Sequence, residues 1–239
     1  MSLLSESLKL RYEPVAVCYV DERPLQAKGF AEGRWGCVAS LHVSASKGHI
    51  HVFDRKTFGC PSGGAGIGFG VPFRPNLAEF LSTGSPGQEG EHYWRTPELA
   101  QAFVDQLPIT DVPQEYVVFA PLSKAPCPPA VVSLYVNADQ LSAIVVLASY
   151  GRATNENVIV PMGAGCHTAV LYALREAASE QPRAVLGMTD ITARPHVDPD
   201  LLCVSMPFRM YEELERNVEG SFLEQRDWLK IKERIRSDR

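Results

Sequence analysis

Apolar runs alternate with polar stretches along the whole chain, and the spacing within each run distinguishes strands from helices. Short runs rich in valine and other β-branched residues predict strands. Runs in which apolar residues recur every three or four positions predict helices with one buried face. The predicted strands are 14–20, 49–53, 115–122, 130–137, 158–160, 184–188 and 201–206. The predicted helices are 3–10, 36–47, 75–81, 97–107, 138–150, 166–178 and an amphipathic tail over 211–236 with a break at Gly220.

The order of these elements predicts the fold class. Strands and helices intermix without a regular strand–helix–strand beat, so we expect an α+β fold, a single domain with a central mixed β-sheet flanked by helices. The domain is expected to cover residues 1–239, with 209–239 as a C-terminal helical tail. The stripe formed by Trp228, Ile231 and Ile235 should pack on the domain or on another subunit. This helix is therefore a candidate surface for forming a homo-oligomer.

Composition narrows the class of protein. The chain has 239 residues, 45% of them hydrophobic, and a formal net charge of -5. This charge argues against a nucleic-acid partner, which would need a concentrated basic surface. We expect no membrane partner, because no apolar run approaches the roughly 20 residues of a spanning helix. The N-terminus lacks the pattern of a signal peptide, which predicts a cytoplasmic protein.

A glycine-rich run over 59–70 is the most unusual segment of the chain. Glycine weakens helices and strands, so the run predicts a loop in which the backbone turns sharply or approaches something closely. The dinucleotide-binding and P-loop spacings are both missing. A nonstandard anion-binding loop remains open, in which Gly63, Gly64 and Gly66 would hold a small anionic metabolite or nucleotide. The alternative is a tight turn that packs under a strand.

Six cysteines are too few for a disulfide scaffold in a chain of this length, so each must be a core residue, a ligand or a reactive thiol. Three of them lie in apolar strands or a proline-rich connection and are expected to be structural or incidental: Cys18, Cys127 and Cys203. Cys37 and Cys166 each follow a glycine at a predicted helix start, where the helix dipole favours a thiolate. Cys60 lies in the glycine-rich run, whose backbone N–H groups suit a thiolate or cluster sulfur.

We therefore hypothesise that Cys37, Cys60 and Cys166 converge to bind an iron–sulfur cluster, with one open or non-cysteine position, or another thiophilic metal such as zinc. The absence of a C-x-x-C pair means that the fold would have to assemble the site. A small-anion binding module without redox chemistry is the alternative. A thiol enzyme is a third class, but His167 is expected to be a poor base for Cys166 because adjacent helical side chains diverge by about 100°.

Several landmarks together resemble the uncharacterised ArCR family, domain of unknown function 169. They are Glu13-Pro14-Val15-Ala16-Val17, the Cys37 helix, the Cys60 segment with its glycines, the Cys166 turn and Asp190-Ile191-x-x-Arg194. The resemblance covers residues 8–206 and implies a prokaryotic, cytoplasmic, single-domain protein. It implies that the three cysteines are family-type positions and carries no established activity. In the cysteine site hypothesised above, and independently of this resemblance, Arg194 is expected to pair with an anionic ligand.

Overall fold

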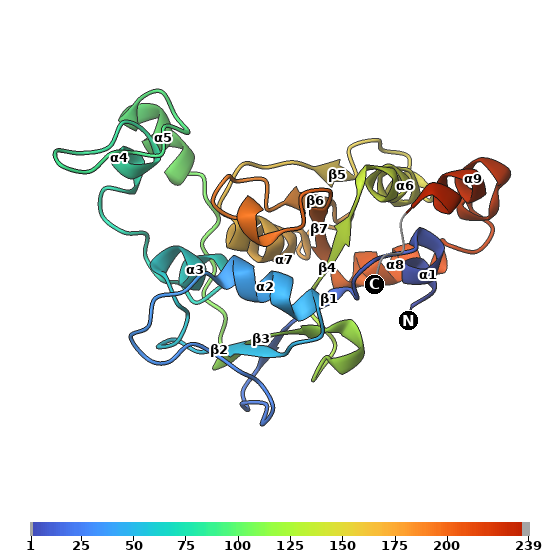
Figure 1. The fold of residues 1–239 in the computed structure, drawn as a ribbon, viewed down its shortest axis with the longest axis horizontal. Helices are drawn as coiled ribbons and strands as arrows, with labels where there is room; N and C mark the ends of the chain where they lie inside the picture. The colour runs from blue at the N-terminus through green and yellow to red at the C-terminus, as the bar shows by residue number, and fades with distance from the viewer. Residues whose placement is uncertain (1, 236–239) are drawn as a thin grey trace.

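Seven strands form one sheet in the computed structural model, which describes residues 2–235 (Figure 1). The strand order is β2-β3-β1-β4-β7-β6-β5, and every neighbouring pair is antiparallel except β5 and β6. The strands are β1 (Val15–Val20), β2 (His51–Phe53), β3 (Tyr116–Pro121), β4 (Val131–Val136), β5 (Val158–Ile159), β6 (Ala184–Gly187) and β7 (Leu202–Pro207). The prediction of a single α+β domain with a mixed sheet is confirmed.

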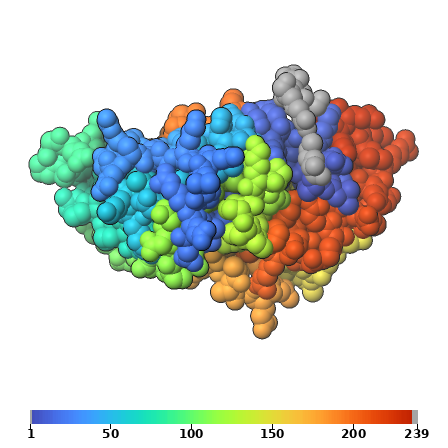
Figure 2. Space-filling view, turned by 90° about the horizontal axis from the view of Figure 1, so that it is seen from below, coloured from blue at the N-terminus to red at the C-terminus, as the bar shows by residue number. Residues whose placement is uncertain are grey.

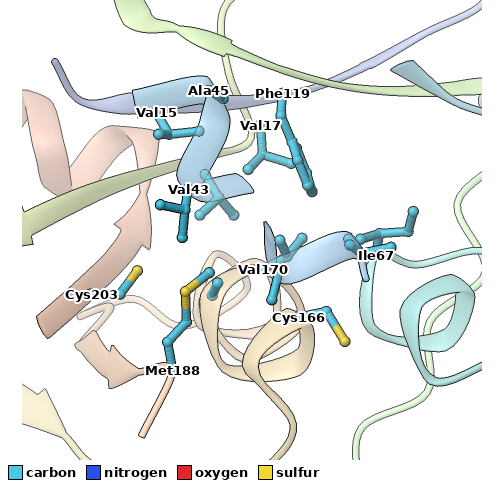
Figure 3. Packing of buried hydrophobic residues seen from close by; sticks show 14 of the residues in the cluster. Val15, Val17, Val43, Ala45, Ile67, Phe119, Cys166, Val170, Met188 and Cys203 are labelled. Atoms are coloured by element: carbon cyan, nitrogen blue, oxygen red, sulfur yellow. The ribbon is translucent and has the colours of Figure 1, made fainter. Parts of the chain in front are cut away.

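Helices cover both faces of the sheet. One face carries α1 (Leu3–Leu8), α6 (Ala138–Ser149), α8 (Phe208–Arg216) and α9 (Arg226–Arg234). The other carries α2 (Val38–Ser46), α3 (Pro61–Gly66), a π-helical segment (His167–Leu171) and α7 (Tyr172–Glu176). The alternation of β4 divides its side chains between these two cores: Val132 and Leu134 join the first, and Val131 and Tyr135 join the second. Figure 3 shows part of the second core.

The prediction that 59–70 is a loop is wrong, because residues 61–66 form α3. Pro61 occupies its first turn, where a missing N–H costs nothing, and the Cys60 sulfur accepts a hydrogen bond from the Gly63 N–H at 3.2 Å. The glycines serve close packing of this helix. A Cβ atom on Gly66 would lie 2.6 Å from the Cys166 sulfur, nearer than atoms tolerate.

Residues 71–110, here called the excursion, leave the body of the domain through a narrow neck. Gly70 N–H donates to the Thr110 carbonyl at 3.0 Å, and Val112 N–H donates to the Gly68 carbonyl at 2.8 Å. Arg55 bridges the two segments of the neck by donating hydrogen bonds to the carbonyls of Phe69 and Val112. The excursion carries α4 (Leu77–Leu81) and α5 (Pro97–Val104), which stand apart from the sheet in Figure 1 and form one end of the molecule in Figure 2.

The C-terminal tail packs on the domain as far as residue 235, and residues 236–239 of the predicted tail lie outside the described part of the chain. It consists of α8, a short turn of 3₁₀-helix and α9, and the predicted break falls at Gly220, which has a φ of 73°. The Trp228 side chain is buried, and its indole N–H donates to the Ser7 carbonyl at 3.1 Å. Formation of a homo-oligomer through this helix stays a prediction. Within residues 2–235 no helix has both the length and the apolar content required to cross a membrane.

Candidate functional site

A pocket of about 440 Å³ lies between the excursion and the body of the domain. The body contributes the starts of α2 and α3, the start of the π-helical segment, and the loop after β6. The excursion contributes aromatic and leucine side chains from α4, α5 and the segments beside them. Because Cys37, Cys60 and Cys166 all line it, we call it the cysteine pocket.

The three cysteines come from three helix starts. Cys37 and Cys60 are the N-cap residues of α2 and α3, and Cys166 directly precedes the π-helical segment. Figure 3 shows the Cys166 side chain directed away from the core sulfurs of Met188 and Cys203. Its thiol donates to the Ser62 carbonyl at 3.2 Å, which joins the π-helical segment to α3.

Burial favours the protonated form of Cys60 and of Cys166. It raises the pKa of Cys60, and the nearby Cys37 adds to the effect, although the hydrogen bond from Gly63 N–H opposes it. Burial raises the pKa of Cys166 far above its ordinary value, with further contributions from Cys60, Cys37 and Asp190. Within residues 2–235, no three His, Cys, Asp or Glu side chains are arranged to hold a single metal ion.

The other predicted ligand residues lie outside the lining of the pocket. Gly63, Gly64 and Gly66 are buried where α3 packs against neighbouring side chains. The Arg194 guanidinium donates to the backbone carbonyls of Leu201 and Pro199, so it fastens the chain that leads into β7. The three glycines therefore allow close packing of α3, and the arginine stabilises the chain before β7; none of the four lines the pocket.

Cys166 and His167 contact each other although they are adjacent in sequence. The Cys166 sulfur lies 3.7 Å from His167 Nδ1, so the expectation that the pair would diverge is wrong. The physical reason is packing on α3, because both side chains crowd Gly66: a Cβ atom there would lie 2.6 Å from the Cys166 sulfur and 2.9 Å from His167 Nδ1. Burial lowers the pKa of His167 to about 4, which leaves the imidazole neutral at physiological pH.

Unpartnered polar atoms concentrate in the cysteine pocket. Within residues 2–235, six buried side-chain nitrogen or oxygen atoms lack a hydrogen-bond partner. Four of the six belong to residues that line this pocket: Arg74 Nη2, Tyr93 Oη, His167 Nε2 and Asp190 Oδ2. Such atoms are rare in folded proteins because each forfeits its hydrogen bonds to water. Their concentration makes the pocket the candidate binding site of the described residues.

Three of these four groups have contacts that hold them in place. Asp190 Oδ1 accepts a hydrogen bond from Ala193 N–H at 3.0 Å, which leaves Oδ2 directed elsewhere. The Arg74 guanidinium stacks on Phe80, with its carbon 3.5 Å from the ring centroid. The Phe73 ring lies 5.6 Å from the imidazole of His167.

Sequence reasoning missed Arg74 and Tyr93 because both belong to the excursion. Their neighbours in sequence form no chemical motif, and only the packing of the excursion against the body brings them to the cysteines. Asp190 was noticed in the sequence only as part of a family landmark.

Residues 3–217 match the sequence model of domain of unknown function 169, described as uncharacterised ArCR. The chain belongs to the DUF169 family. The matched region of this DUF169 protein includes every residue that lines the cysteine pocket. Neither a curated protein nor a solved structure matches the chain.

Proposed function

We propose that this DUF169 protein binds a small organic molecule in the cysteine pocket. The observation that carries the proposal is the concentration there of four buried polar atoms without partners. Leaving a buried polar group unpaired costs about 1–3 kcal/mol. A ligand that pairs several of these groups would recover that free energy, and the apolar walls would bind the rest of its surface.

The dimensions and lining of the pocket support this function. Its volume of about 440 Å³ falls in the range typical of small-molecule sites. Aromatic rings of Trp35, Phe73, Phe80 and Phe103 form much of its wall, and a few polar groups converge from the two sides. Pockets of this composition fix the orientation of a ligand through the polar groups and gain affinity from the apolar contacts.

The test is native mass spectrometry of the purified protein with a library of small organic molecules. We expect one-to-one noncovalent complexes that are weakened at least about tenfold by Tyr93→Phe or Asp190→Asn, because the first removes a hydroxyl from the pocket and the second replaces a charged carboxylate acceptor with a neutral amide. Tyr150→Phe is the matched control, since the Tyr150 hydroxyl donates to the Gly220 carbonyl and lies outside the pocket lining. Complexes that survive both pocket variants unchanged would refute the proposal.

A second candidate function is the binding of an iron–sulfur cluster by Cys37, Cys60 and Cys166. The protein would then have a redox role. The observation that favours it is that these three cysteines line one pocket. Within residues 2–235 no three His, Cys, Asp or Glu side chains are placed to bind one metal ion. We therefore test a cluster rather than a single ion, because the ligands of a cluster are spread over several iron atoms. Such binding would also require Cys166 to lose its proton and its hydrogen bond to Ser62.

Anaerobic reconstitution with iron and sulfide tests this second function. If a cluster binds, the reconstituted protein contains iron and sulfide and shows a broad visible absorption band. Cys60→Ser should abolish the absorption band and the bound iron and sulfide. Cys203→Ser is the control, because Cys203 is buried in the core away from the pocket. Colourless protein that carries no iron after reconstitution would rule the cluster out.

A further inference from the structure

We infer that the ligand of the cysteine pocket is a zwitterion with a ring-bearing apolar body. This inference rests on the proposed function and adds the chemical class of the ligand. It follows from the two charged side chains among the four unpartnered groups, Arg74 and Asp190.

Arg74 and Asp190 reach the pocket from opposite sides. Arg74 belongs to the excursion, whereas Asp190 lies in the loop after β6 in the body. Each has a buried atom without a partner, and no ion pair joins the two side chains in the described part of the chain. The Asp190 side chain is deeply buried, with an exposed fraction of 6% for the residue. Arg74 is half-buried, but its Nη2 atom is shielded from water. A charged group with a buried, unpaired atom favours a partner of opposite sign, so each side chain specifies one end of the ligand.

Simpler ligands leave one of these charges unpaired. An anion would pair with Arg74 but would bring its charge towards Asp190 and towards Glu91, which also lines the pocket. A cation would pair with Asp190 and leave Arg74 without a partner. An uncharged apolar molecule would satisfy neither. A molecule with one anionic and one cationic group satisfies both, and Arg74 suits a planar anion such as a carboxylate.

The remaining lining accounts for the rest of the ligand. Phe73 and Phe103 of the excursion and Trp35 of the body line the pocket with aromatic surface that would contact an apolar body. His167, with an exposed fraction of 2%, keeps one imidazole nitrogen free to hydrogen-bond the ligand. Aromatic ring pairs add specific stabilisation beyond the area that they bury.

The experiment uses ligand-observed nuclear magnetic resonance to measure binding of four sets of ring-bearing compounds. The sets are zwitterionic, anionic, cationic and uncharged, with equal numbers of compounds of matched molecular size. We expect the hits to concentrate in the zwitterionic set. Hits that concentrate in another set would overturn the inferred class and leave the proposed function standing. If no compound of any set binds, both the class and the proposed function are overturned.

Two variants then test which end of the ligand pairs with Arg74 and which with Asp190. Three ligands are compared: the best zwitterionic hit, its analogue without the anionic group and its analogue without the amine. Arg74→Met should weaken the zwitterion at least about tenfold and leave the analogue without the anionic group unchanged, because methionine retains an apolar contact with Phe80. Asp190→Asn should weaken the zwitterion similarly and spare the analogue without the amine, while asparagine can still accept from Ala193 N–H. Arg95→Met is the control, since Arg95 is exposed and outside the pocket lining. Equal losses for the zwitterion and both analogues would overturn the assignment.

Discussion

At the scale of single residues, position in the fold distinguishes side chains that look alike in the sequence. His42 and His167 are both buried, but Nδ1 of His42 lies 2.8 Å from the Tyr135 hydroxyl inside the core, whereas His167 lines the cysteine pocket. The six cysteines divide similarly. Cys18 and Cys203 are core residues as predicted, because they lie in apolar strands, a pattern that the sequence displays directly.

The close packing of α3 predicts a penalty for a single added methyl group. Gly66→Ala would place a Cβ atom 2.6 Å from the Cys166 sulfur and 2.9 Å from His167 Nδ1. We expect the free energy of unfolding to fall by about 1–3 kcal/mol, the usual cost of overpacking a core. Urea unfolding measures it. Gly151→Ala is the matched control, because its nearest neighbour would lie 3.9 Å away, and equal losses for the two variants would contradict this view of α3.

The buried histidines predict a loss of stability in acid. Burial lowers the pKa of His42 to about 3 and that of His167 to about 4, whereas an unfolded histidine has a pKa near 6.5. Below about pH 6.5 the unfolded chain therefore binds protons that the native protein does not. The stability that the two neutral imidazoles contribute is complete above that pH and falls as the pH drops towards about 4.

Urea unfolding across this pH range measures the effect. His167→Gln should reduce the slope of unfolding free energy against pH by up to about 1.4 kcal/mol per pH unit between about pH 4 and 6, and leave the slope above about pH 7 unchanged. An unaltered slope in the acid range would show that His167 is protonated in the native protein.

At the scale of elements, the hydrophobic pattern predicts most of the fold. Strands such as β4 are recognisable because they are continuous apolar runs, and α6 carries a capping box at Asn137 that fixes its start. The glycine-rich run misled the prediction because glycine lowers intrinsic helix stability. In α3 that loss is offset by packing, which only the assembled fold supplies.

The neck of the excursion predicts a local effect of one side chain. Arg55 donates to the Val112 carbonyl at 2.6 Å and to the Phe69 carbonyl at 3.2 Å. In Arg55→Met, the amide hydrogens of Gly70 and Val112 should exchange with solvent roughly tenfold faster, because hydrogen bonds that hold the neck closed are lost. Hydrogen-exchange mass spectrometry checks this. Lys56→Met, at an exposed neighbour, serves as the control, and equal exchange in both variants would contradict a clamping role.

At the scale of the whole molecule, two packing arrangements differ in how far the sequence predicts them. The excursion meets the body across the cysteine pocket, which brings Arg74 and Tyr93 to cysteines that the sequence had singled out. No local pattern in the sequence predicts that the excursion packs against the body at this pocket. The tail was easier to interpret, because the apolar stripe of α9 requires a partner surface, and α1 provides part of it.

The docking of the tail predicts a large contribution to stability. Trp228→Ala should lower the free energy of unfolding by about 3–5 kcal/mol, because it empties a buried site and removes the hydrogen bond to Ser7. Leu229→Ala, at the exposed next position, should cost less than about 1 kcal/mol. Chemical denaturation of the two variants makes the comparison, and similar losses would mean that α9 does not dock as described.

The proposed binding function is tested most directly by the imidazole nitrogen resonances of the isotope-labelled protein during titration with small-molecule hits. His42 and His167 each have a buried Nε2 without a partner, but only His167 lines the cysteine pocket. The structure predicts that ligands shift the His167 Nε2 resonance and leave that of His42 in place. A His167 resonance that no ligand moves, or equal shifts at both histidines, would contradict binding in the cysteine pocket.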